Sequence, residues 1–260
     1  MNRTNRIAGA FGKGKAFIAF ITGGDPSIEK SEEYILKMLE AGADIIEIGI
    51  PFSDPIAEGP TIQNANIRAL AAGTTVDKLF SLVESLRKKT EAPLLFMSYL
   101  NPVFHYGYER FFSACEGKGV DGIIIPDLPF EEHGELADTA AAHGVTLISM
   151  IAPSSEARLG LLIRPATGFI YTVASMGVTG VRSQLDAGLD GLLKKIKSEA
   201  TIPVAAGFGI GTAEQARQVA RYADGVIVGS AIVRLVEQHG ANAASQIFEF
   251  VSRMKSAISS

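Results

Sequence analysis

The residue most suggestive of chemistry is Glu47, an acid within the otherwise apolar run of residues 45–50. Side chains alternate along a strand, so Ile46 and Ile48 share one apolar face while Glu47 lies on the other, toward a barrel interior. Such a carboxyl group is costly unless it is paired, hydrogen-bonded or protonated, and burial raises its pKa. It can then exchange protons near neutral pH, which makes Glu47 a candidate general acid/base. A purely structural buried carboxylate is the alternative.

Two further acids, Asp54 and Glu58, follow this run in a loop that contains three prolines. A second carboxylate on a lid above an interior one is a plausible acid/base partner, and a solvated surface acid is the alternative for each. None of the 12 lysines lies within an expected strand, which disfavours a Schiff-base mechanism. The histidines are scattered and no cluster of His and carboxylates suggests a metal.

Two glycine-rich turns, at residues 207–212 and 229–232, indicate a phosphate site. Each follows an expected strand and opens an expected helix, where unbonded N–H groups can hold an anion. Their position after the seventh and eighth strands is a recurring phosphate site of one barrel class. Ordinary turns are the alternative. Together these features predict acid/base chemistry on a small organic phosphate, without a cofactor.

The elements that must position these residues alternate along the chain. The expected strands are 17–22, 44–50, 94–99, 122–125, 146–151, 169–173, 203–206 and 225–229. Helical periodicity is clearest at 32–40, 76–89, 131–142, 185–197 and 213–222. Eight such units predict an α/β protein, a (β/α)8 TIM barrel formed as a single domain over residues 1–260, with an extra N-terminal helix. A doubly wound open sheet is the alternative.

A short sequence echo places an aspartate directly before three of the strands, at Asp44, Asp121 and Asp224. We interpret this repeat as a helix-to-strand turn that serves architecture rather than chemistry.

Composition narrows the class of protein further. The 260 residues carry 24 basic and 28 acidic side chains, for a net charge of −4, so no nucleic-acid partner is expected. The single cysteine, Cys115, excludes an internal disulfide and suits a reducing compartment. No apolar run approaches the length of a membrane span and no signal-peptide pattern begins the chain. We therefore expect a cytoplasmic protein with no membrane contact.

Five motifs carry a resemblance to a known family. They are Glu47-x-Gly49-x-Pro51-Phe52-Ser53-Asp54-Pro55, Gly59-Pro60-Thr61-Ile62-Gln63, Pro126-Asp127-Leu128-Pro129, Gly177-Val178-Thr179-Gly180 and Gly207-Phe208-Gly209-Ile210. The sequence resembles the tryptophan synthase alpha subunit from about residue 3 to 257. The resemblance implies a lyase of tryptophan biosynthesis, which splits indole-3-glycerol phosphate into indole and glyceraldehyde 3-phosphate by a retro-aldol reaction. It also implies an α2β2 complex with a beta subunit that uses pyridoxal phosphate.

The resemblance further implies a role for each matching residue. Glu47 matches the catalytic acid/base, Glu58 the second acid, which contacts the indole N–H, and Tyr171 an active-site tyrosine. The residues that match phosphate ligands are Gly180, Gly209, Gly229 and Ser230. Those near the expected indole pocket are Phe20, Leu100 and Asn101. The two lids match residues 52–59, with Asp54, and 175–185, with Thr179 tying them together.

One departure from the family pattern is visible at Glu58, where the family has aspartate. Two other functions stay open at this point: another phosphate-binding barrel of the sugar-phosphate isomerase type, and an activating subunit with weakened catalysis. The presence of Glu47, Tyr171 and an acid at position 58 argues against the second.

Overall fold

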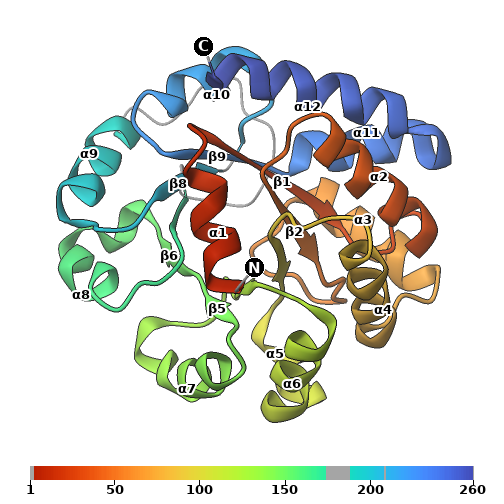
Figure 1. Ribbon diagram of the computed structural model, residues 1–260, viewed down its shortest axis with the longest axis horizontal. Coiled ribbons are helices and arrows are strands. Elements are labelled where there is room, and N and C mark those ends of the chain that lie inside the picture. The colour runs from red at the N-terminus through yellow and green to blue at the C-terminus, as the bar shows by residue number, and fades with distance from the viewer. Residues whose placement is uncertain (1–2, 174–187, 208, 260) are drawn as a thin grey trace.

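The computed structural model describes residues 3–173, 188–207 and 209–259, which form a ring of parallel strands surrounded by helices (Figure 1). The strands are β1 (Ala16–Thr22), β2 (Ile45–Gly49), β3 (Leu94–Met97), β4 (Gly122–Ile124), β5 (Thr146–Leu147), β6 (Ser149–Ile151), β7 (Ile170–Val173), β8 (Val204–Gly207) and β9 (Gly225–Val228). Their order in the sheet is β5-β4-β3-β2-β1-β9-β8-β7-β6, and every pair is parallel.

The two ends of this order, β5 and β6, are separated in the chain only by Ile148. They are two halves of the predicted fifth strand, 146–151, which is therefore not continuous. The first half pairs with β4 and the second with β7, so the strand changes neighbours at Ile148 as the sheet curves round. The predicted (β/α)8 barrel is confirmed, and its ring is completed through this split strand.

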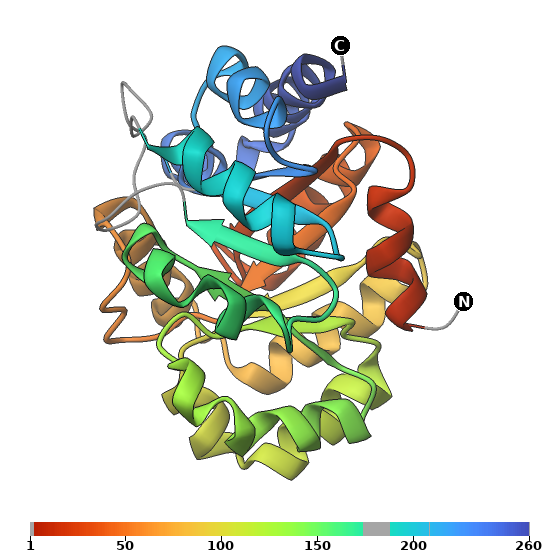
Figure 2. The same ribbon diagram turned by 90° about the vertical axis from the view of Figure 1, so that its left-hand side faces the viewer.

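Apart from α1, the helices of the described residues cover the outside of the ring, as Figures 1 and 2 show. They are α1 (Arg3–Phe11), α2 (Ile28–Glu40), α3 (Pro60–Ala71), α4 (Val76–Arg87), α5 (Leu100–Tyr106), α6 (Tyr108–Lys118), α7 (Gly134–Ala142), α8 (Leu159–Ile163), α9 (Leu189–Glu199), α10 (Ala213–Ala220), α11 (Ser230–His239) and α12 (Ala244–Ser259). Several begin where the sequence supplies a cap; Ser27 and Thr75, for example, accept hydrogen bonds from the N–H groups of Lys30 and Lys78.

The hydrophobic core has two layers, and strand alternation assigns residues to them. Ile46 and Ile48 pack between the sheet and the helices, whereas Ile45 faces the interior of the ring. The predicted extra N-terminal helix is α1, which lies across one end of the barrel (Figures 1 and 2). Its Ile7 is buried in the interior layer, so this end is closed and the opposite end is left for a site.

Candidate active site

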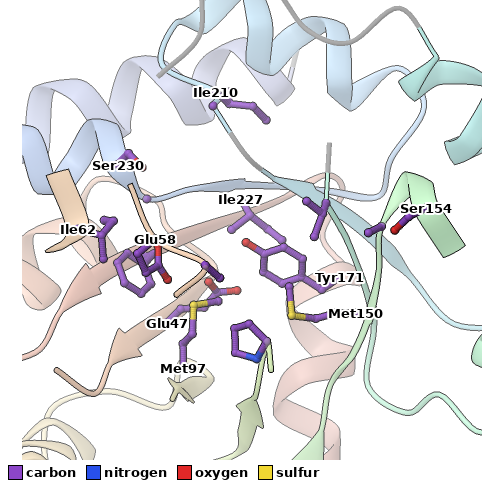
Figure 3. A pocket seen from close by; sticks show the side chains of 17 residues that line it. Glu47, Glu58, Ile62, Met97, Met150, Ser154, Tyr171, Ile210, Ile227 and Ser230 are labelled. Atoms are coloured by element: carbon purple, nitrogen blue, oxygen red, sulfur yellow. The ribbon is translucent and has the colours of Figure 1, made fainter. Parts of the chain in front are cut away.

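A cavity of about 310 Å³ opens at the carboxyl ends of the strands (Figure 3). The sequence-predicted residues that line it are Phe20, Glu47, Glu58, Tyr171, Gly209, Gly229 and Ser230. They come from five strands or from the loops that follow them, so residues far apart in sequence meet at the face where barrel enzymes carry their chemistry.

Glu47 lies in the middle of β2 and points into the cavity, as the strand alternation predicts (Figure 3). It is 0% exposed, and within the described part of the chain neither of its carboxyl oxygens has a hydrogen-bond partner. Burial therefore acts on the carboxyl group without compensation and raises its pKa to about 8. Near neutral pH this group is protonated and close to its titration point, as proton transfer in both directions requires.

Tyr171 reaches the same cavity from β7, on the side away from Glu58 (Figure 3). Its phenol is buried, and burial raises its pKa well above the usual value, with the negative charges of Glu47 and Glu58 adding to the effect. The hydroxyl group consequently stays protonated and can donate a hydrogen bond to an anion or to substrate.

The loop between β2 and α3 brings Glu58 to the opposite wall of the cavity (Figure 3). Glu58 is only 7% exposed, although its chain neighbours Ile56 and Pro60 are exposed. Asp54 behaves differently, because its side chain is exposed and accepts a 2.5 Å hydrogen bond from the Ser53 hydroxyl. Of the two acids that the sequence places on this loop, the structure brings only Glu58 to the cavity.

The two glycine-rich helix starts differ in how their backbone N–H groups are bonded. At α10, Thr212 and Gln215 form a capping box, and the N–H groups of Gly211 and Thr212 donate to Gln215 Oε1 at 2.9 and 3.2 Å. At α11, by contrast, Gly229 provides no side-chain cap, and Ser230 is the first helical residue. The start of α11, together with Gly209, is therefore the part of the cavity best suited to an anion.

Glycine is favoured at Gly209 and Gly229 for different reasons. Gly209 has φ of +76°, a left-handed conformation that favours glycine. At Gly229 a Cβ atom would lie 3.1–3.3 Å from atoms of Phe20, tighter than an ordinary contact. Phe20 thus lies between the anion site and Glu47, whose register partner it is on β1.

Some predicted residues lie elsewhere. Leu100 and Asn101 do not line the cavity: Leu100 packs against the outer core and donates its N–H to Asp127 at 2.9 Å, and Asn101 is exposed. Thr179, Gly180 and the predicted lid 175–185 lie outside the described residues.

Other residues that line the cavity were not found from the sequence. Two of them are Met97, which lies next to Glu47, and Met150, which lies next to Tyr171 (Figure 3). The available signal for Met97 was its place two residues after interior-facing Leu95 on the same strand. Among the described residues, no group of three His, Cys, Asp or Glu side chains could hold a metal ion. No helix within the described ranges is long and apolar enough to cross a membrane.

The parallel strands form a closed barrel, and one cavity contains both an interior carboxyl group and the start of α11, which has no side-chain cap. These features are typical of barrel enzymes that act on small phosphorylated substrates. A family profile described as "Tryptophan synthase alpha chain" matches residues 10–259. The chain belongs to this family.

Curated relatives agree over nearly the whole length. A tryptophan synthase alpha chain of Lacticaseibacillus casei is 44% identical, covering 98% of this chain and 96% of the relative, and one of Geobacter sulfurreducens is 44% identical, covering 98% and 99%. Among solved structures, the alpha subunit of Legionella pneumophila str. Paris has a TM-score of 0.89 at 35% identity, covering 99% of this chain and 98% of that one.

Family membership settles the reaction class. The chain is a carbon–carbon lyase of tryptophan biosynthesis that cleaves indole-3-glycerol phosphate to indole and glyceraldehyde 3-phosphate. The comparisons do not favour the isomerase or the weakened activating subunit that the sequence alone left open.

Proposed function

We propose that the cavity around Glu47 carries out this cleavage by general acid/base catalysis, with no cofactor bound to this chain. The observation that carries the proposal is the state of Glu47, which is fully buried, without a hydrogen-bond partner among the described residues, and has a pKa raised to about 8. A group in this state can both donate and accept a proton in one catalytic cycle.

The retro-aldol reaction needs two proton transfers. One proton is added at indole C3, which makes the ring an electron acceptor; another leaves the adjacent glycerol hydroxyl as the C–C bond breaks and its electrons return to the ring. Protonated Glu47 supplies the first proton, and the carboxylate left behind accepts the second. The acid is thereby regenerated, and no oxidant or reductant is consumed.

The remaining cavity residues support these transfers. When C3 is protonated, positive charge develops on the indole nitrogen, and the Glu58 carboxylate stabilises it by accepting a hydrogen bond from the indole N–H. Tyr171, which stays protonated, donates to the carboxylate form of Glu47 or to the departing oxygen. Gly209, Gly229 and Ser230 hold the phosphate through backbone N–H groups at the start of α11.

A beta subunit is the partner we propose, in an α2β2 complex in which the partner carries pyridoxal phosphate. One similar structure, from Pyrococcus furiosus at 33% identity and TM-score 0.87, concerns mutual activation of the tryptophan synthase a2b2 complex. On this chain, Ile56 lies on the same loop as Glu58 and Phe104 lies on α5; they are 77% and 67% exposed and offer apolar contacts. A cytoplasmic location is part of the same proposal.

Addition of a cognate beta subunit is expected to raise the rate of indole release, because a partner that packs on Ile56 would hold the loop that carries Glu58 in place. The measurement is indole release at saturating beta subunit, with complex formation checked by sedimentation. An unchanged rate in a confirmed complex would contradict the proposed activation.

The catalytic proposal is tested by the rate of indole release from indole-3-glycerol phosphate in Glu47→Gln, which keeps the side-chain shape but cannot transfer a carboxyl proton. Turnover is expected to fall by roughly 10²–10⁴ or more, since one residue serves both transfers. A control is Glu131→Gln, which makes the same change at an exposed glutamate in the connection after β4, outside the cavity lining, and which is expected to keep full activity. Retention of more than about a tenth of the wild-type rate in Glu47→Gln would contradict the proposal that Glu47 is the catalytic acid/base.

A further inference from the structure

The main chain next to Glu58 is held by two side chains. The Ala57 N–H donates to the Tyr99 hydroxyl oxygen at 2.8 Å, and Gln63 Nε2 donates to the Glu58 carbonyl oxygen at 2.7 Å. Gln63 lies in the first turn of α3, directly after the loop, so its bond is local. Tyr99 comes from a different βα unit and therefore ties the loop to the barrel itself.

Tyr99 is itself firmly placed. It is 5% exposed, and it stands directly before α5, where the N–H of Leu100 donates to Asp127 at 2.9 Å. Its ring packs against the ring of Phe52, with centroids 5.6 Å apart, so Tyr99 contacts the loop near its beginning as well as next to Glu58. Tyr99 therefore contacts the loop at two points, through its ring and through its hydroxyl group.

The hydroxyl of Tyr99 is suited to this contact. Burial, with the negative charge of Glu58 as a second cause, raises the pKa of its phenol, so the group stays neutral. Tyr99 does not line the catalytic cavity; it lines a small adjacent pocket that shares Glu58 and Phe20 with the cavity. Tyr99 can therefore influence the reaction only through the residues it holds.

We propose that Tyr99 is a positioning residue for the alpha reaction, whose buried hydroxyl fixes the Ala57 peptide and so sets Glu58 against the cavity before substrate binds. The inference rests on the role proposed above for Glu58. Its physical basis is that a catalytic group must be held within a fraction of an ångström, and that a misplacement of about 1 Å can cost about 100-fold in rate. Glu58 has one more rotatable bond than aspartate, so the position of its main chain matters all the more.

The test is Tyr99→Phe, which keeps the ring that packs on Phe52 and removes the hydroxyl group that accepts the hydrogen bond from the Ala57 N–H. We expect kcat for indole release to fall about 10- to 100-fold, while KM changes little because the phosphate is bound at α11. Tyr106→Phe is the matched control: it also removes a tyrosine hydroxyl with a hydrogen bond, 2.6 Å to Asp77, but on the outer surface, and kcat should be unchanged. A wild-type kcat in folded Tyr99→Phe would overturn the inference.

A double variant distinguishes positioning from a general structural role. If Tyr99 acts through Glu58, adding Tyr99→Phe to Glu58→Gln should slow the reaction no further than Glu58→Gln alone. If the two losses multiply, Tyr99 acts elsewhere and the inference is wrong while the proposed role of Glu58 stands. If Glu58→Gln alone is as fast as wild type, the proposed role of Glu58 fails, and the inference fails with it.

Discussion

The two ends of the barrel differ in whether a buried carboxyl group has bonding partners. At the closed end, Asp121 is fully buried and accepts a hydrogen bond from the Leu94 N–H at 2.8 Å, while forming ion pairs with Arg87 and, at 3.1 Å, with Arg6. At the open end, Glu47 is equally buried and neither of its oxygens has a partner among the described residues. Burial raises the pKa of both groups, but only at Asp121 do two arginines and a backbone hydrogen bond act against this rise.

Asp121 belongs to a repeated device. Asp44 accepts from the Phe17 N–H at 2.7 Å and Asp224 from the Val204 N–H at 3.0 Å, each from the start of the adjacent strand. In every case the aspartate just before one strand is bonded to the beginning of its neighbour, which agrees with the architectural interpretation of the sequence echo. A paired carboxylate thus supports the ring, whereas an unpaired one is kept for chemistry at the expense of stability.

The largest effect that separates the two ends is the pH dependence of unfolding. Unfolded, the Glu47 carboxyl releases its proton near pH 4.5; folded, it keeps it to about pH 8. Between these values the unfolded state binds fewer protons, so the free energy of unfolding falls as pH rises, by about 5 kcal/mol in total. Denaturant unfolding of wild type and Glu47→Gln from pH 4.5 to 8 measures this, because the variant lacks this contribution to the slope. Parallel pH profiles would contradict the unpaired state of Glu47.

The next effect is at the closed end. Asp121→Asn leaves the largely buried Arg87 without its carboxylate, and the free energy of unfolding should fall by about 3–5 kcal/mol, measured by urea unfolding. The comparable change Asp224→Asn removes a partner of the more exposed Lys197 and should cost less. Both folded variants should retain turnover. A loss of turnover in folded Asp121→Asn would contradict the conclusion that the closed end supports stability and the open end supports catalysis.

The smallest effect concerns the anion site. Gly209→Ala strains a residue with φ of +76°, by about 1–2 kcal/mol, and displaces its N–H from the phosphate, so KM for indole-3-glycerol phosphate should rise about tenfold in steady-state assays. Gly240→Ala is the matched control, since Gly240 also has positive φ, +51°, but lies at the far end of α11. Equal changes of KM in both variants would show that strain, and not loss of an anion contact, is responsible.

Much of this arrangement follows from local rules. Alternation along residues 44–50 places Glu47 in the interior, and the spacing of eight βα units predicts the barrel. The break at Ile148 could not be predicted, because it depends on which neighbours each half of the strand meets after closure. The side-chain cap at the start of α10 could be predicted from the sequence, because Thr212 and Gln215 have the spacing of a capping box.

The sequence could not predict the hydrogen bond of Tyr99 or the positions of Leu100 and Asn101. An aromatic residue just before a short helix has no spacing that distinguishes a hydrogen bond to a loop 42 residues away from ordinary packing. The resemblance placed Leu100 and Asn101 near the indole pocket, whereas in the structure both lie at the start of α5 and neither lines the cavity.

The central claim is that Glu47 is held protonated by burial alone, ready to donate a proton to the substrate. The direct measurement is an NMR pH titration of the chain labelled with ¹³C at the glutamate carboxyl carbons, with the Glu47 signal assigned by its absence in Glu47→Gln. The Glu47 signal is expected to titrate with an apparent pKa of about 8. A titration midpoint near the ordinary value of 4.5 would show that the carboxyl group is already ionised at neutral pH, and would contradict the account.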